Sequence, residues 1–486
     1  MYAIQKNKRK KVSTTNSGPG KPVRTITDPL EKDMQANPGR PFPIGQYVLS
    51  ELLLGRIVSD GGPGANFTDV ADLTSPANRF ETFTLQQSID LPTITLTITI
   101  SDVGAVLERI NKHGLSGEEF VKIKLNSPER SQRQAIDLLF HVRDVSTITP
   151  DAKRAGTKYT IFCSTKELLV SNLENINKYF AKTESEIAET IFKRNITDSP
   201  TSRILKQANG GGFTLWKERK FEVDESYGSP GKIIPGLTPI DACLRMASGA
   251  WGGPYYKGSA YRFFENVDGF HFANIEYRLQ QTKREGANFN IDPLTISEPP
   301  KTIASYRNVK TQRPLTITSA HDRIINGTYS NSVRTIDYMR KKTIDTHMSI
   351  DKTYNQYSHT NNLQNFSKSF FETFGKKNPF QYTVTKDSIQ GNNIDKVAGH
   401  QRAYLDLLSS YRTIIDVYGD VTLKPGECIG LNVTEASPQS EDTSIFSGTW
   451  FISSVTHVVD GSEMITSLGL SKSGIQQKHN NTKTSY

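Results

Sequence analysis

Residues 93–101 read Thr-Ile-Thr-Leu-Thr-Ile-Thr-Ile-Ser. Side chains along a β-strand point alternately to its two faces, so the isoleucine and leucine side chains share one face and the hydroxyl side chains share the other. An apolar face opposite a hydroxyl-bearing face is typical of a strand in a β-barrel or sandwich wall with one wet side. This stretch therefore predicts a fold built around antiparallel sheets.

The segments on either side of this strand continue the pattern. Further strands are predicted at Phe80–Gln86, Val121–Leu125, Phe140–Thr149 and Tyr159–Cys163. Asp102 is expected to cap a helix over residues 103–113, which ends at the turn-forming Gly114. Residues 46–165 are thus predicted to form a first β domain, a barrel closed in part by a helix.

Helical spacing replaces the alternation after residue 165. One apolar stripe of the predicted 166–194 helical region consists of Leu168, Leu169, Leu173, Ile176 and Phe180. Farther on, Thr238 and Pro239 have the residue types of a helix cap and a first helical position. Asp268-Gly269 between alternating aromatic residues predicts a β-hairpin. Residues 166–300 are therefore predicted to form a mixed α/β middle domain.

Strand signals return near the C-terminus. A strand is predicted at Cys428–Val433, and a hairpin is predicted to pair 449–459 with 463–470 across Asp460-Gly461. We expect residues 301–472 to form a second β domain with an insertion around 320–399, whose sequence is rich in Asn, Ser, Thr and Lys. The predicted fold class is α+β, mostly β.

The net charge of +9 is concentrated at the two ends of the chain. Residues 1–40 contain nine Lys or Arg and three Asp or Glu, and the last fifteen contain three Lys and no acid. We therefore predict a basic arm over 1–45 and a basic tail over 473–486, around a nearly neutral body. Nucleic-acid binding through the basic arm remains an alternative, although a neutral body disfavours a phosphate-binding groove.

Catalytic and metal-binding signatures are missing from the sequence. It contains no Walker A loop, HExxH motif, GxSxG elbow or dinucleotide fingerprint. His271 is expected on the exposed face of a strand, and Glu118-Glu119 in a solvated turn. The three cysteines are far apart, and Cys163 and Cys243 are predicted to be buried. No catalytic residue, metal ligand or cofactor is therefore predicted; a cell-wall hydrolase stays an alternative, because carboxylates distant in sequence can converge.

Other sequence features concern location. No apolar run approaches the roughly 18 residues of a membrane span, and the N-terminal Lys and Arg residues precede no apolar segment of a secretory signal. Synthesis in a reducing compartment, such as the bacterial cytoplasm, is consistent with the sparse cysteines.

Three parts of the sequence resemble one protein family. Residues 81–125, the helix and aromatic hairpin of 237–251 and 261–279, and residues 421–470 are together similar, in their order, to the baseplate hub proteins of contractile-tailed bacteriophages. The resemblance implies two tail-tube-like β-barrel domains with a helical or mixed middle domain. It also implies a location in the tail baseplate of the virion.

The resemblance further implies a geometric function and its partners. Hub proteins form homotrimers whose six similar barrels make a pseudo-sixfold ring, which joins the central spike protein to the hexameric tail tube protein. DNA only passes through the lumen, no small-molecule substrate is expected, and the basic arm would contact neighbouring baseplate proteins. The threonine face would line the channel or contact a neighbour; the interface candidates are Thr93, Thr95, Thr97, Thr99, Trp450 and Ile452.

Overall fold

The computed structural model describes residues 26–27 and most of the chain from 47 to 475. Within 47–475 the residues outside the description are 60–64, 75–79, 104–106, 108–114, 127–135, 149–155, 209–214, 216, 229–230, 254–257, 282, 292–306, 338–340, 351–358, 362, 365–367, 376–379, 386–393, 434–444 and 461–462. The predicted basic arm, basic tail and helix 103–113 therefore lie largely outside the described residues.

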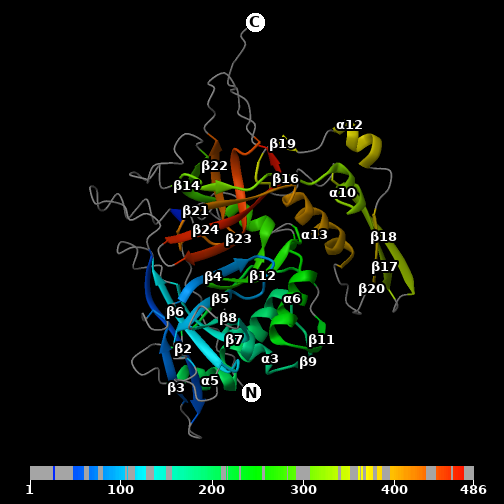
Figure 1. Cartoon of the computed structure of the whole chain (residues 1–486). Coiled ribbons are helices and arrows are strands. Elements are labelled where there is room, and N and C mark those ends of the chain that lie inside the picture. Colours follow the sequence, from blue (N-terminus) through cyan, green and yellow to red (C-terminus); the bar gives the residue numbers. More distant parts are fainter. Residues whose placement is uncertain are drawn as a thin grey trace, which may run out of the picture.

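A 15-stranded sheet forms the body of the molecule, and its main path runs β1-β14-β22-β23-β4-β5-β8-β7-β6-β2-β3. Its N-terminal strands are β2 (Val48–Ser59), β3 (Ala65–Asp72), β4 (Phe80–Ser88), β5 (Thr95–Val103), β6 (Glu119–Asn126), β7 (Ile136–Ile148) and β8 (Gly156–Thr165). The remaining strands are β1 (Ile26–Thr27), β14 (Lys283–Ile291), β15 (Thr311–Gln312), β16 (Thr316–Ile317), β21 (Tyr411–Tyr418), β22 (Cys428–Val433), β23 (Gly448–Asp460) and β24 (Glu463–Lys472). Figure 1 shows the N-terminal strands at the lower left and the C-terminal ones above them.

The alternating stretch forms β5, as predicted. Leu96, Ile98 and Ile100 are fully buried, whereas Thr95 and Thr97 are half-buried on the opposite face. Each such Ile or Leu contributes about 1.5–3 kcal/mol by leaving water. The core that they enter also contains residues of β23 and β24, so the N-terminal and C-terminal strands share it.

The pairing of β4 with β23 joins the two groups of strands. Seven antiparallel partners, from Ser454↔Ser88 to Asp460↔Thr82, connect strands that lie far apart in the sequence. Among the described strands, the sheet is mostly antiparallel and does not close into a barrel. The structure is therefore mostly β with some helices, as the sequence predicts.

The middle segment packs helices and short strands around a second core. Its elements are α3 (Lys166–Asn172), β9 (Ile176–Phe180), α4 (Glu184–Ile191), the π-helix η3 (Phe192–Thr197), α5 (Pro200–Gln207), β10 (Lys220–Val223), β11 (Lys232–Leu237), α6 (Pro239–Gly249), β12 (Tyr261–Asn266), β13 (Gly269–Asn274) and α8 (Ile275–Gln281). The predicted cap is confirmed, because the Thr238 hydroxyl accepts the N–H of Asp241 at the start of α6. The predicted hairpin is also confirmed, as β12 and β13 with Asn266↔Gly269 as its last pair.

Two predictions for residues 166–194 are wrong. Ile176 and Phe180 lie in the strand β9 instead of a helical stripe, because β11 pairs antiparallel with β9. The spacing of Glu184, Glu186 and Glu189 in the sequence predicts an exposed helix face, but Glu184 is buried and forms an ion pair with Lys232 at 3.0 Å. Both errors arise from β11, which lies about fifty residues farther along the chain.

The insertion contains ordered structure. Its elements, with the helix that follows, are α10 (Ala320–Ile325), β17 (Ser330–Asp337), β18 (Lys342–Ser349), β19 (Leu363–Gln364), α12 (Lys368–Phe370), η5 (Phe371–Gly375), β20 (Phe380–Thr385) and α13 (Ile394–Leu408). The three-stranded sheet β18-β17-β20 projects to one side in Figure 1, with α13 between it and the body. Near the C-terminus, β25 (Gly474–Ile475) pairs with β19.

Candidate assembly surface

One face of the large sheet crosses from the N-terminal to the C-terminal strands. Residues directly opposite one another in neighbouring strands point to the same face. Following the register from β8 through β5, β4, β23 and β24 to β21, one such row is Phe162, Thr97, Thr84, Val458, Ile465 and Tyr418. All six side chains are exposed or half-buried, and we call the face that carries them the outer face.

The next row of the outer face is mainly polar. It consists of Thr160, Thr99, Thr82, Asp460 and Glu463. Two lysines near this face are paired with acids: Lys158 lies 2.5 Å from Glu81, and Lys310 forms an ion pair with Glu463. The outer face therefore combines one row of apolar, aromatic and threonine side chains with one row of hydroxyl groups and carboxylates.

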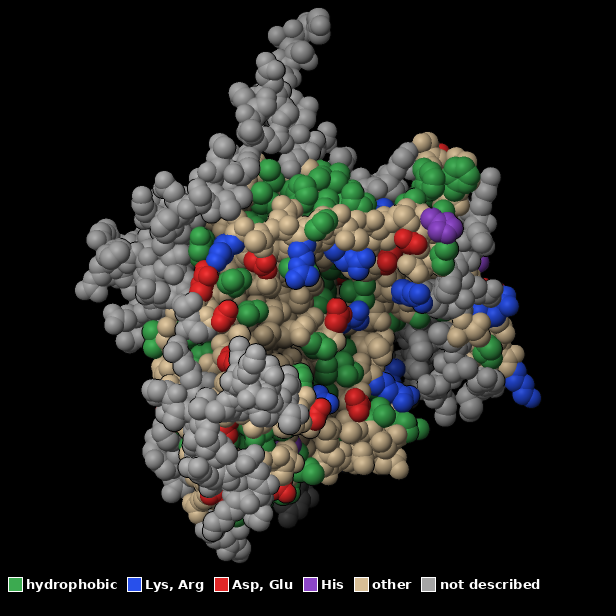
Figure 2. Space-filling model, in the orientation of Figure 1, with side chains coloured by type: hydrophobic (Ala, Val, Ile, Leu, Met, Phe, Trp, Pro, Cys, Tyr) green, Lys and Arg blue, Asp and Glu red, His purple; other side chains and the backbone are tan. Residues whose placement is uncertain are grey.

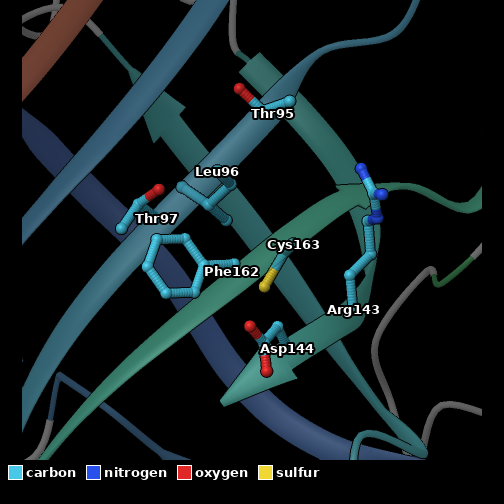
Figure 3. Close-up of a pocket in the computed structure, with 7 residues that line it drawn as sticks. All are labelled: Thr95, Leu96, Thr97, Arg143, Asp144, Phe162 and Cys163. Carbon is cyan, nitrogen blue, oxygen red and sulfur yellow. The ribbon is translucent and has the colours of Figure 1, made fainter. Parts of the chain in front are cut away.

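A hollow of about 590 Å³ opens on the outer face, lined by Thr95, Leu96, Thr97, Arg143, Asp144, Phe162 and Cys163 (Figure 3). The register shift in β7 between Val142 and Asp144 lies at its edge. Phe162 is 41% exposed at this hollow. Burial raises the pKa of the Cys163 thiol and keeps it protonated, so this cysteine is a poor nucleophile.

The structure separates the six interface candidates. Thr95, Thr97 and Thr99 lie half-buried on the outer face, and two of them line the hollow. Thr93 is only 4% exposed, and Trp450 and Ile452 are fully buried in the core of the C-terminal strands. Three of the six therefore offer a surface to another chain.

Trp450 belongs to the apolar core of the C-terminal strands and packs against a lysine there. The Lys472 ammonium lies 4.3 Å from the centre of the Trp450 ring and 5.7 Å from that of Tyr411, and it donates to the carbonyl of Ser447 at 3.1 Å. Burial lowers the pKa of Lys472 to about 7. These cation–π contacts explain why an aromatic residue occupies position 450 without reaching the surface.

Phe162 is the most prominent of the outer-face residues that are not among the six interface candidates, since it is large, apolar and exposed. The sequence predicts a strand at Tyr159–Cys163 and burial of Cys163, without assigning a face to Phe162. Its alternation places Phe162 on the same side as Thr160, opposite Tyr159 and Ile161, which are buried. The period of two, applied to this run as well, would have identified the exposed aromatic side chain.

Two predictions about polar residues are wrong. His271 is 3% exposed instead of lying on an open face, and its ring contacts Glu222 at 3.3 Å and Arg278 at 3.2 Å. Glu119 is 2% exposed instead of solvated, because Arg56 pairs with its carboxylate at 3.0 Å and the N–H groups of Ser116 and Gly117 donate to it. Both side chains are used to hold strands together.

A buried ion pair fastens the middle segment to the large sheet. The Arg219 guanidinium lies 3.1 Å from the Glu265 carboxylate, which also accepts hydrogen bonds from the N–H of Ile94 and the hydroxyl of Thr165. Burial raises the pKa of Glu265 to about 7 against the opposing effect of Arg219. With both partners enclosed, this cluster connects β12 to β5 and β8 and offers no access to a substrate.

The described part of the chain contains no group of three or more His, Cys, Asp or Glu residues that could hold a metal ion. The helices described here are all too short or too polar to cross a membrane.

Comparison with known proteins identifies the fold. No family model matches the sequence, and no curated protein does. The structure resembles that of the 43 kDa tail protein of prophage MuSo2 from Shewanella oneidensis, with a TM-score of 0.51 and 8% identity, over 89% of this chain and 100% of that one. The chain has the fold of a phage tail protein.

Two further tail proteins match over similar lengths. A tail protein from Neisseria meningitidis gives a TM-score of 0.47 and 12% identity, covering 88% of this chain and 98% of its own. A prophage tail protein from Listeria monocytogenes gives a TM-score of 0.43 and 9% identity, and the match covers 86% of this chain and 94% of that protein.

Proposed function

We propose that the chain is a structural baseplate hub of a contractile phage tail. The observation that carries the proposal is the continuous outer face: β4 and β23 pair directly, so the two groups of strands present one surface. The tail-protein fold over 89% of the chain supports the same function. We propose no reaction for this protein.

The mechanism is geometric. In the proposal, residues 46–165 and 301–472 each contribute a tube-like barrel domain, completed in the assembly, and 166–300 connect them. Three copies would present six similar domains and so match the sixfold tail tube on one side and the threefold spike on the other. The seven β4–β23 partners keep the two domains of one copy at a fixed angle. Rotation by a third of a turn can then close a ring, as heterologous contacts between identical subunits require.

The outer face suits the wall of a channel for DNA. Strong binding of a phosphate backbone requires clustered, unpaired Lys and Arg side chains. The two rows described above contain apolar side chains, hydroxyl groups and carboxylates but no Lys or Arg, while the nearby Lys158 and Lys310 are paired with acids. DNA would therefore pass without being held. The basic arm would contact neighbouring baseplate proteins in the virion.

The mass of the full chain in solution tests the ring. We expect light scattering to give three times the 54.3 kDa of one chain, either for the protein alone or after mixing with the neighbouring spike protein. Electron microscopy of the same sample should show a ring with a central opening. A mass of one chain in both conditions, with no ring, would overturn the proposal.

Thiol labelling tests the position of the outer face. All three native cysteines are buried, so Thr97→Cys supplies an accessible thiol on that face. A small maleimide should label this variant in the isolated chain and equally in the assembled ring, because the lumen admits small molecules. Wild-type protein is the unlabelled control, and Lys193→Cys the exposed reference. Protection of Thr97→Cys on assembly would instead assign the outer face to contacts between copies.

A further inference from the structure

A second exposed surface lies on the two-stranded sheet of β9 and β11, which we call the ribbon. It carries a pair of large apolar side chains. Tyr179 and Ile233 are directly opposite each other in its register, and they are 58% and 62% exposed. Tyr side chains are enriched in protein interfaces and supply much of their binding energy, so an exposed Tyr beside an exposed Ile is a candidate contact site. Figure 2 shows hydrophobic side chains with Lys or Arg beside them where this ribbon lies in Figure 1.

A groove next to the same ribbon provides positive charge. It has a volume of about 280 Å³ and is lined by Asn175, Ile176, Asn177, Lys178, Phe180, Thr190, Ile191, Arg194 and Asn195. Neither Lys178 nor Arg194 forms an ion pair with any residue in the described part of the chain; Lys178 only lies 5.8 Å from the centre of the Phe180 ring. Arg194 belongs to the π-helix η3, and single turns of this rare helix are frequent at functional sites.

The complementary features lie on the opposite side of the molecule. β3 is the last strand on the main path of the large sheet, and its described pairing is with β2 alone. Asp69, Val70 and Asp72 on this edge strand are exposed, and neither carboxylate forms an ion pair among the described residues. Asp72 only accepts hydrogen bonds from Thr74. Edge strands with free main-chain groups readily contact other chains.

We infer that the β3 edge of one copy docks on the β9–β11 ribbon of the next copy in the ring. Lys178 and Tyr179 are neighbours on β9 and point to its opposite faces, so the β3 edge would lie along the edge of β9 that β11 does not cover. Asp69 and Asp72 would face Lys178 and Arg194 on the side of the groove, and Val70 would pack on Tyr179 and Ile233 on the other side. Figure 1 shows β3 and the ribbon on opposite sides of the molecule. Two different, complementary patches on opposite sides make a head-to-tail contact, which closes into a ring under rotation. This contact rests on the proposed function and names the surfaces that would produce it.

Charge reversal tests the contact in the full chain, with the spike protein added if the wild type needs it to form a trimer. The double variant Lys178→Glu, Arg194→Glu should raise the concentration at which the trimer dissociates about tenfold or more, because two attractive pairs become repulsive. Lys193→Glu is the control for the change on η3: like Arg194→Glu it replaces one positive charge by a negative one, but at an exposed position outside the groove lining. Light scattering over a dilution series measures all three proteins.

A charge swap makes the test specific. Asp72→Lys alone should weaken the trimer, and its combination with Lys178→Glu should restore part of the loss. Asp69→Asn removes the second charge without straining the positive φ of 53° at this position, which Asn tolerates. Tyr179→Ser with Ile233→Ser should weaken the trimer at any salt concentration, whereas the effect of the charge variants should shrink in high salt.

The outcomes separate this contact from the proposed function. If the wild type forms a trimer and the groove variants dissociate while Lys193→Glu does not, the contact is supported. If the wild type and every variant form equally stable trimers, the ring stands and this contact is refuted. A wild type that stays a single chain, with and without spike protein, refutes both.

Discussion

β5 and β13 have the same alternating sequence pattern but different surroundings. In β5 the even positions from 96 to 100 are buried and the threonines between them are half-exposed. In β13 every residue is buried: Phe270 and Phe272 enter the core of the middle segment, while Ala273 enters a cluster with Tyr404 and Phe451. Alternation in a sequence thus identifies the two faces of a strand, whereas elements distant in the sequence determine whether the second face is exposed to water.

The largest expected effect concerns the buried face of β5. Ile98→Ala should lower the free energy of unfolding by about 4 kcal/mol, because a fully buried side chain is replaced by a cavity. Urea unfolding measures the loss. A loss under about 1 kcal/mol would show that this face is not tightly packed.

Gly269→Val should break the β12–β13 hairpin. Gly269 has a φ of 153°, and a Cβ atom there would lie 2.2 Å from the carbonyl oxygen of Lys220 in β10. We expect a loss of about 3 kcal/mol in the free energy of unfolding, from strain and displacement of β10. Gly249→Ala is the control, since no atom lies within 4 Å of its added Cβ. An unchanged melting temperature for Gly269→Val would contradict the close approach of β10.

Buried histidines predict acid sensitivity. Burial lowers the pKa of His457 to about 4, and it also lowers the pKa of His271 on β13. A histidine whose folded pKa lies below the ordinary 6.5 favours the folded state above pH 6.5, and this stability is lost as the pH falls from 6.5 towards 4. His457 alone accounts for roughly 3 kcal/mol of that loss.

A variant isolates the contribution of His457. His457→Gln retains a polar group near the hydroxyl of Thr466, which lies 3.0 Å from the histidine ring nitrogen. Its stability should therefore fall less steeply between pH 6.5 and 4 than that of the wild type, as followed by thermal unfolding at each pH. Parallel profiles for the two proteins would argue that His457 does not titrate with folding.

The smallest expected effect concerns the exposed face of β5. Thr97→Val should change the free energy of unfolding by about 0.5 kcal/mol or less, because the side chain is half-buried and β-branched residues suit strands. Compared with Ile98→Ala in the same urea experiment, it measures the contrast between the two faces. A loss above about 2 kcal/mol would mean that the Thr97 hydroxyl is needed within one chain.

Local patterns in the sequence were sufficient for much of the fold. The threonine–isoleucine alternation of β5, the Thr238–Pro239 start of α6 and the Asp-Gly turn of the β12–β13 hairpin depend on neighbouring residues, and all three predictions are confirmed. The three threonines on the outer face follow from the same alternation.

Contacts between distant residues account for the errors. The four-residue spacing of Ile176 and Phe180 fits a helix, and only pairing with β11 makes the segment a strand. Trp450 was an interface candidate, but in the structure its ring is buried against Lys472. No residue close to Trp450 in the sequence indicates this contact. The Arg56 side chain that buries Glu119 lies 63 residues away. Such burial depends on the tertiary structure and leaves no local pattern.

The pairing of β4 with β23 also constrains how the chain is synthesised. The hydroxyl of Ser88 donates to the carbonyl of Ser453, a contact that spans 365 residues. On the ribosome, β4 can pair with β5 early, while its other edge stays open until nearly the whole chain has emerged. An open edge strand is a site of aggregation. A chain terminated before residue 448 would therefore retain an exposed edge and depend on chaperones, and we expect completion of β23 to be a late, slow step of folding.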